Sequence, residues 1–198
     1  MRSRVQCVVA VASLCILMAS SDARAGLPVS SSNCDGDAGC WVILSVPQYA
    51  QENTLWCHAA AAQSIVNAYS AARTQCTCYQ SNTGASCSTN QISYVSNVEN
   101  TIWTLSGADG IIVNDYMSWS TTWDQLYNRH IPMVARVLKN NGSYGHFIVI
   151  KGVDDDASAD WVRVWDPEFG GSASWVDFST LVSAGGTYQW THSIYNFQ

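Results

Sequence analysis

Residues 51–72 read QENTLWCHAAAAQSIVNAYSAA, and this stretch decides the fold of the chain around it. Alanine is abundant from residue 56 onward and neither glycine nor proline interrupts the run, so the composition favours one helix over residues 56–72. Its apolar residues recur at helical spacing: Ala59, Ala62, Ile65, Val66 and Tyr69. Asn53 or Thr54 is expected to cap its start. Cys57 therefore lies at the N-terminal end of a helix.

That position makes Cys57 a candidate for a reactive thiolate. The free N–H groups and the positive dipole end of a helix N-terminus stabilise an anion, so a thiolate is favoured there, and more so beside an imidazolium. Gln51 lies six residues earlier, on the loop that enters the helix. Its side-chain amide and the backbone N–H of Cys57 are expected to form a two-donor oxyanion hole. The alternative for Gln51 is an ordinary exposed loop glutamine.

Four histidines compete for the role of base. His58 neighbours Cys57 on the helix, so its side chain points about 100° away from the sulfur. His130 lies in a loop, and His192 lies in a late strand, where a structural role is expected. His146 follows Gly145 and begins a strongly apolar strand, which makes a polar side chain at that point conspicuous. We therefore expect His146 to be the base; a buried histidine with satisfied hydrogen bonds is the alternative.

Asp166 is the candidate for orienting the base. The Asp-rich turn over residues 154–160 makes strands 145–153 and 161–166 a hairpin, which brings Asp166 to the same end of the sheet as His146. A carboxylate there accepts the histidine N–H and favours the imidazolium. The alternative is an aspartate that caps the turn at Pro167. The three aspartates 154–156 are expected to form a solvated turn rather than a calcium site.

The rest of the chain separates helices from strands. Residues 26–45 are expected to be an extended entry segment held by a disulfide, and residues 73–90 a polar loop. Further helices are expected over residues 90–106 and 122–128. Strands are expected over residues 133–138, 145–153, 161–165, 172–178 and 187–197. The prediction is an α+β fold in two lobes, an N-terminal helical lobe with the cysteine helix and a C-terminal antiparallel sheet lobe.

The first 25 residues have the pattern of a secretory signal peptide. Two arginines precede an apolar run over residues 5–18, and Ala23-Arg24-Ala25 offers the small residues that a signal peptidase reads. The run is shorter than the ~20 residues of a membrane helix. We expect a signal peptide over residues 1–25, cut after Ala25, and one domain over residues 26–198 that is secreted or periplasmic. An uncleaved anchor is the alternative.

Charge narrows the range of partners. Cleavage would remove Arg2, Arg4, Arg24 and Asp22, so that 6 basic and 14 acidic residues remain and the net charge is −8. No basic stripe is left for a nucleic acid, and an anionic membrane surface would repel the domain. Nucleic-acid binding and membrane insertion after cleavage are therefore not expected.

Cysteine usage also indicates an oxidising compartment. Residues 26–198 contain six cysteines: Cys34, Cys40, Cys57, Cys76, Cys78 and Cys87. Cys34 and Cys40 flank a short loop and are expected to bridge, as are two of Cys76, Cys78 and Cys87. Cys57 and one other then stay unpaired, which is itself an indication of chemistry in a secreted protein. Pairing of all six is the alternative; zinc is not expected because no histidine lies near residues 76–87.

Several of these motifs carry a family resemblance. They are Val46-Pro47-Gln48, Gln51-Glu52, Trp56-Cys57, Ala59-Ala60, Gly145-His146, Gly152-Val153-Asp154 and Asp166-Pro167. Together they resemble the papain-like cysteine peptidases, and most closely the small bacterial branch with bacteriocin-processing peptidases and secreted effector proteases. The resemblance implies a papain-like fold, catalysis by Cys57, His146 and Asp166, and Gln51 as oxyanion donor. The chain departs from many relatives at His58, where they carry an aromatic residue.

The function predicted on these grounds is that of a secreted, monomeric cysteine peptidase acting on a protein or peptide substrate, with no cofactor and no metal ion. Its reaction would pass through a thioacyl intermediate on Cys57. A transglutaminase or a cell-wall amidase would keep the same site and change the acceptor. A catalytically silent binding module is a further alternative, in which the nine Trp and nine Tyr line a peptide or glycan groove. A bridge from Cys57 to Cys76 or Cys78 would support it.

Overall fold

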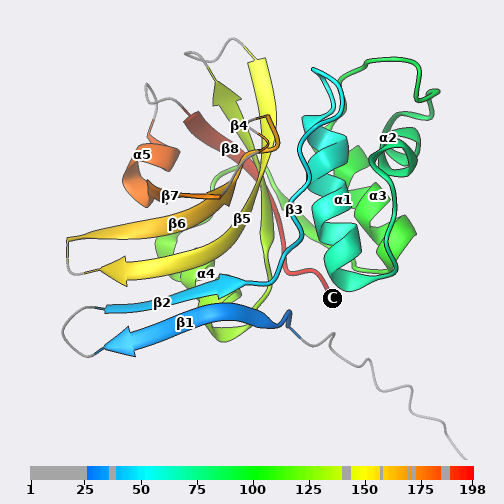
Figure 1. Ribbon diagram of the computed structural model, residues 1–198. Coiled ribbons are helices and arrows are strands. Elements are labelled where there is room, and N and C mark those ends of the chain that lie inside the picture. The colour runs from blue at the N-terminus through cyan, green and yellow to red at the C-terminus, as the bar shows by residue number, and fades with distance from the viewer. Residues whose placement is uncertain are drawn as a thin grey trace, which may run out of the picture.

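A computed structural model describes residues 26–35, 39–139, 144–156, 158–168, 170, 173–183 and 188–198. The expected signal peptide, residues 1–25, lies outside the described residues. Three helices gather on one side of the molecule and the strands on the other (Figure 1). The helices are α1 (Cys57–Tyr69), α2 (Gln75–Thr83) and α3 (Val95–Ser106), and each contacts the other two. None of the described helices has the length and apolar character that a membrane span requires.

Helix α1 confirms the helix predicted from the alanine run, although it ends at Tyr69 rather than at residue 72. All of residues 57–66 are buried, because small alanine side chains let α2, α3 and strand β5 approach from several sides. The predicted cap is wrong. Trp56 is the N-cap residue and no side chain caps the helix; Asn53 instead accepts the Trp56 N–H through its backbone carbonyl, at 3.0 Å. The first turn thus keeps its N–H groups clear of a capping side chain.

Helix α2 corrects the prediction of a polar loop over residues 73–90. Thr74 caps the helix by accepting the N–H of Thr77, and Gly84 ends it in the left-handed conformation with φ of 68°. Its buried residues follow the helical spacing i, i+3, i+4, i+7, but most are polar: Gln75, Cys78, Tyr79 and Asn82. A search for apolar periodicity misses such a helix because two of its buried side chains, Gln75 and Tyr79, are polar and are held by hydrogen bonds.

The remaining helices differ from the prediction in their bounds or in their presence. Helix α3 begins at Val95, five residues later than predicted, and ends at Gly107 with φ of 71°. The helix predicted over residues 122–128 is present but begins earlier, as α4 (Trp119–Trp123), and continues in the π-helical turn η1 (Asp124–Asn128). This turn packs against strands β2 and β5 and so covers the sheet. Helix α5 (Phe178–Val182) was not predicted.

Among the described residues, eight antiparallel strands form one sheet, in the order β1-β2-β5-β4-β8-β3, with β6 and β7 added beside β5. Their bounds are β1 Val29–Asp35, β2 Gly39–Leu44, β3 Ile111–Val113, β4 Met133–Lys139, β5 Tyr144–Asp156, β6 Ala159–Trp165, β7 Ser174–Asp177 and β8 Tyr188–Tyr195. The α+β prediction, helices first and antiparallel strands after, is confirmed. The five strands predicted after residue 132 are all present.

Two details of the sheet differ from the prediction. The described residues between 26 and 45 are extended and held by the Cys34–Cys40 disulfide, as predicted, but they also form a β1–β2 hairpin that joins the sheet through β5. Gly39 permits this close approach, since a Cβ at that position would lie 1.7 Å from the carbonyl oxygen of Asp155. The turn expected over residues 154–160 is shorter, because β5 extends through Asp156 and β6 begins at Ala159. The long β5 therefore serves as the common partner of β2, β4 and β6.

Candidate active site

Cys57 is the first residue of α1, and its thiol is unpaired. The disulfides are Cys34–Cys40, as predicted, and Cys76–Cys87, which settles the choice left open among the three later cysteines. Cys57 and Cys78 remain free, so the alternative in which all six cysteines pair is wrong. The described part of the chain thus has one free thiol at a helix N-terminus and one, Cys78, inside the helical lobe.

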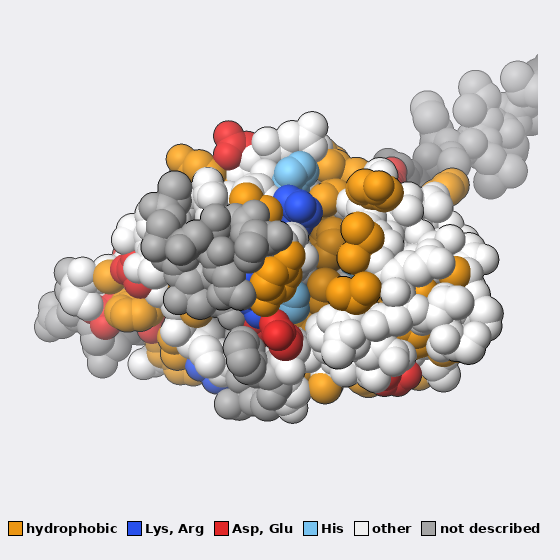
Figure 2. All heavy atoms as spheres, turned by 90° about the horizontal axis from the view of Figure 1, so that it is seen from above, with side chains coloured by type: hydrophobic (Ala, Val, Ile, Leu, Met, Phe, Trp, Pro, Cys, Tyr) orange, Lys and Arg blue, Asp and Glu red, His pale blue; other side chains and the backbone are white. Residues whose placement is uncertain are grey.

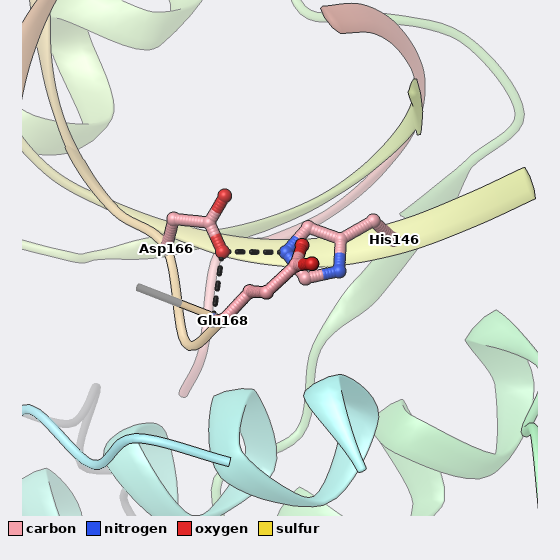
Figure 3. Close-up of side chains that lie close together, drawn as sticks. All are labelled: His146, Asp166 and Glu168. Atoms are coloured by element: carbon pink, nitrogen blue, oxygen red, sulfur yellow. Dashed lines mark hydrogen bonds and ion pairs between the residues drawn. The ribbon is translucent and has the colours of Figure 1, made fainter. Parts of the chain in front are cut away.

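His146 and Asp166 are brought together by the β5–β6 hairpin. His146 lies near the start of β5 and Asp166 directly follows β6. The ring Nε2 lies 2.6 Å from Asp166 Oδ1, and the same oxygen accepts the backbone N–H of Glu168 at 2.9 Å (Figure 3). Both side chains are buried, at 4% and 9% exposure. Because Asp166 engages Nε2, the other ring nitrogen, Nδ1, is left for Cys57.

The surroundings of His146 favour its charged form. Burial lowers the pKa of His146, but hydrogen bonds to Asp166 and Cys57, together with the charges of both groups, raise it to about 9. An adjacent anion favours the charged form of an imidazole, and at His146 the combined effects of Asp166 and Cys57 outweigh burial. The imidazolium form of His146 therefore persists at neutral pH.

Lys139, at the end of β4, forms ion pairs with Asp166 and with Glu168. Its ammonium lies 2.9 Å from Asp166 Oδ2 and 2.5 Å from Glu168 Oε2. His146, Asp166 and Glu168 offer three ligand atoms within 4.8 Å of one another, which is metal-like spacing. However, Lys139 already supplies the cation between the two carboxylates, and Oδ1 is bonded to the imidazole. The chemistry of this cluster is that of an ion-pair network rather than a metal centre.

Gln51 lines the same cavity as Cys57 and His146. Its side-chain Nε2 donates to the carbonyl oxygen of Thr54 at 3.1 Å. An amide nitrogen has two N–H groups, so one remains for a ligand in the cavity. The Oε1 atom is buried and has no hydrogen-bond partner among the described residues. Gln51 is thus anchored by one N–H group, in a position to donate the other.

The backbone on either side of Gln51 is held by a single residue of α2. The buried side chain of Gln75 accepts the N–H of Glu52 at 2.6 Å and donates to the carbonyl of Ala50 at 2.9 Å. The Gln51 N–H itself donates to the carbonyl of Pro167 at 2.9 Å. These bonds connect the Gln51 loop to the helical lobe and to the turn that carries Asp166.

The segment that follows the Cys76–Cys87 disulfide braces the start of α1. Trp56 stacks on Tyr79 with ring centroids 4.2 Å apart, and its Nε1 donates to the carbonyl of Thr89. His58 turns away from the cavity, where its Nε2 lies 3.0 Å from the carbonyl of Gln91. Burial lowers the pKa of His58 to about 4, against the smaller opposing effect of that hydrogen bond. His58 is therefore a structural, neutral histidine.

A cavity of about 880 Å³ separates the helical lobe from the sheet and opens on these groups. Figure 2 shows it as a hollow along which histidine, basic and acidic side chains lie, bordered by hydrophobic ones. The helical side contributes Leu55, Ile92, Tyr94 and Val95, and the sheet contributes Arg136, Tyr144, His146, Glu168 and His192. His192, expected to be structural, thus lines the cavity. Lys139, Glu168 and Arg136 are site residues that sequence reasoning missed.

The groups around this cavity can perform one type of chemistry well. A thiol at a helix N-terminus is a nucleophile, and a carboxylate-oriented imidazole supplies and removes protons. Amide N–H groups on either side of the sulfur can stabilise a negatively charged oxygen. Together these are the requirements of nucleophilic acyl transfer.

Comparison with known proteins gives a family and a fold. Residues 43–193 match the Peptidase_C39 like family. The chain superposes on the peptidase domain of Streptococcus ComA, a bi-functional ABC transporter involved in quorum sensing, with a TM-score of 0.55 and 15% identity, covering 74% of this chain and 94% of that domain. No curated protein matches the chain.

Two further solved structures share the fold. A putative C39-like peptidase from Bacillus anthracis gives a TM-score of 0.54 at 14% identity, over 78% of this chain and 96% of that one. UfSP from C. elegans gives 0.50 at 12% identity, over 90% of this chain and 35% of that one. At such identities the likeness speaks for the fold, which agrees with the helices-then-sheet arrangement described above.

Proposed function

Because the chain belongs to the Peptidase_C39 like family of papain-like cysteine peptidases, we propose that it is a secreted peptidase with Cys57 as nucleophile, His146 as acid and base, and Asp166 as the residue that orients His146. The observation that carries the proposal is the unbridged thiol of Cys57 at the start of α1, in the cavity that also holds His146 bonded to Asp166. The family match over residues 43–193 confirms the family resemblance seen in the sequence motifs.

The first step forms a thioester. The Cys57 thiolate attacks the carbonyl carbon of the scissile peptide bond, and the developing oxyanion accepts the backbone N–H of Cys57 and the free side-chain N–H of Gln51. The C–N bond then breaks, and the imidazolium Nδ1–H of His146 gives its proton to the leaving amine. The acyl group stays on the sulfur.

The second step restores the enzyme. Neutral His146 takes a proton from a water molecule, whose oxygen attacks the thioester carbonyl. The C–S bond breaks, the carboxylic product leaves, and the thiolate and imidazolium form again. Throughout both steps Asp166 holds Nε2–H, so that Nδ1 stays turned toward the sulfur.

Secretion is the second part of the proposal. It is supported by the signal-like pattern of residues 1–25 and by the disulfides Cys34–Cys40 and Cys76–Cys87, which suit an oxidising compartment. N-terminal sequencing of the exported protein should begin at Gly26. Retention of the full chain in the cytoplasm would refute this part and leave the peptidase assignment untouched.

Protein or peptide substrates follow from the family, and the test is a peptide-library digest. We expect wild-type protein to cleave, the Cys57→Ala variant to lose turnover, and the Cys78→Ala variant to keep it, since Cys78 lies outside the cavity lining. Cleavage by Cys57→Ala would disprove the assignment. A primary amine added to the same digest detects a transglutaminase outcome, and peptidoglycan as substrate detects a cell-wall amidase.

A catalytically silent module was the remaining alternative. Its distinguishing feature would have been a bridge from Cys57 to Cys76 or Cys78. Cys76 is instead bonded to Cys87, and both Cys57 and Cys78 are free.

A further inference from the structure

Arg136 places a guanidinium group in the wall of the active-site cavity. It lies on β4, paired with Phe147 on one side and His192 on the other, and it is half-buried. Its Nη1 donates to the hydroxyl of Thr191 at 3.1 Å, and that hydroxyl donates back to the carbonyl of Arg136 at 3.1 Å. The side chain is thus held in one orientation, while the hydrogen bonds of the described residues use one of its five N–H groups.

The guanidinium also lies close to the reacting groups. Gly145 directly precedes His146, and a Cβ at that position would lie 2.4 Å from Arg136 Nη2. Arg136 therefore packs on the backbone of Gly145, in space that any side chain there would fill. A positive charge is fixed one residue away from the acid–base histidine.

This charge has no counterion in the described part of the chain. Two carboxylates of the site are engaged elsewhere: Glu168, which lines the cavity, with Lys139, and Asp166 with His146 and Lys139. Arg136 makes no ion pair with any described residue, although the chain as a whole carries a net charge of −6. Burial and the charge of Arg136 lower the pKa of the neighbouring His192, so that histidine adds no second charge.

We propose that Arg136 is a carboxylate-binding subsite, which selects substrates with an acidic group within a few residues of the scissile bond. The inference rests on the proposed peptidase function and adds a substrate class to it. A guanidinium offers two parallel N–H groups that match a carboxylate, and a partly buried, preoriented guanidinium binds one more strongly than an exposed lysine does. The carboxylate is that of an Asp or Glu side chain, or that of the peptide's C-terminus.

The test compares paired peptides. A library of C-terminally amidated peptides carries Glu or Gln at each of three positions on either side of the cleaved bond, and kcat/KM is measured for each pair. Wild-type protein should favour Glu over Gln at one position by about tenfold or more. The Arg136→Gln variant should bring that ratio close to one, and Arg136→Glu should reverse it in favour of Gln. The same peptides with a free C-terminus identify a C-terminal carboxylate as the recognised group.

Two further variants control for indirect effects of the Arg136 substitutions on the Glu/Gln ratio. Gly145→Ala keeps the charge but displaces the guanidinium, so it should also reduce the Glu/Gln ratio. Arg163→Gln removes a guanidinium that lies on β6 over the Trp175 ring, at 5.4 Å and outside the cavity lining, and should leave the ratio at its wild-type value.

The outcomes separate the two proposals. Cleavage that depends on Cys57 but shows no position sensitive to Glu against Gln, in amidated and free peptides alike, overturns the subsite and leaves the peptidase standing. If no peptide is cleaved, fluorescence anisotropy of the same labelled peptides with the Cys57→Ala variant decides the matter. Tighter binding of Glu peptides that is lost in the Cys57→Ala, Arg136→Gln double variant supports the subsite, and equal binding of Glu and Gln peptides refutes it.

Discussion

The ammonium group of Lys139 lies 2.9 Å from Asp166 Oδ2, the carboxylate oxygen that does not bind His146. Asp166 is therefore shared between an imidazole and an amine, both buried. A buried carboxylate with two cationic partners stays ionised and stays in place. The orientation of the proposed base consequently depends on a residue at the end of a different strand, which never reaches the cavity itself.

The pH profile of peptide cleavage should show this arrangement. Activity is expected to fall as the pH rises through about 9, because His146 then loses the proton that it gives to the leaving amine. In Asp166→Asn this alkaline limb should move to lower pH, since the anion that raises the pKa of His146 is gone. A profile of kcat/KM between pH 5 and 10.5 measures both.

The Lys139→Met variant should not move the same limb to lower pH. Removing a positive charge near His146 favours the imidazolium, so the limb should stay in place or rise. The variant should also lose about 3 kcal/mol of stability, because Asp166 and Glu168 lose their shared partner. A downward shift of the limb would contradict the arrangement proposed here.

Gln75 lies outside the cavity lining, but its hydrogen bonds to Ala50 and Glu52 hold the Gln51 loop. We therefore expect substitutions of Gln75 to lower turnover. Gln75→Ala should lower kcat by about tenfold or more with a smaller change in KM, because Gln51 is no longer held where the oxyanion forms. Gln75→Glu keeps the acceptor for the Glu52 N–H and loses the donors to Ala50 and Gln63, so its kcat should lie between those of the wild type and Gln75→Ala. Equal kcat for all three proteins would remove Gln75 from the machinery.

The two free thiols should differ greatly in reactivity. Burial raises the pKa of Cys78 to about 12, in spite of the opposing charge of Arg73, so its thiolate is scarce at neutral pH. Iodoacetamide at pH 6 followed by mass spectrometry should modify Cys57 alone in the native protein, and both thiols after unfolding. Equal labelling of Cys78 in the native state would count against the assignment of Cys57 as the activated thiol.

His58 should make the fold sensitive to mild acid. Its folded pKa of about 4 lies below the ordinary value of 6.5, so between these values the unfolded chain binds a proton that the folded chain does not. Stability from this residue is present above pH 6.5 and is lost as the pH falls toward 4, by on the order of 3 kcal/mol. Urea unfolding of the wild type and His58→Gln between pH 7 and 4 tests it; the glutamine variant should lose less stability over this range.

The Cys76–Cys87 disulfide should matter for activity as well as for stability. Replacing both cysteines with serine should cost about 3 kcal/mol and should also lower kcat, because residues 89–91 hold the start of α1. The matched control is the Cys34→Ser, Cys40→Ser pair, which opens the β1–β2 hairpin away from the cavity lining and should lower stability alone. If both pairs affect kcat equally, the bracing role is wrong.

Helix α2 could not be predicted from the spacing of apolar residues in the sequence. The cap residues Thr74 and Gly84 lie at its ends, but its buried positions are mostly polar. The hydrogen bonds of two of them, Gln75 and Tyr79, reach residues 50, 52, 63, 89 and 91. Such partners are known only after the chain has folded. The same limit applies to His192, which is polar within a strand and carries no local sign that it faces the cavity.

Residues close together in the sequence were enough to predict three features. These are the alanine-rich helix with Cys57 at its start, the Cys34–Cys40 bridge and the hairpin that joins His146 to Asp166. Helix propensity, short loops and two-residue alternation act over a few residues, and these can be read directly. Lys139 beside Asp166, Arg136 beside Gly145 and Gln75 around Gln51 came only from the tertiary structure. Each of these pairs joins different strands, helices or loops, and the register and packing between such elements are set by burial of the whole core rather than by local pattern.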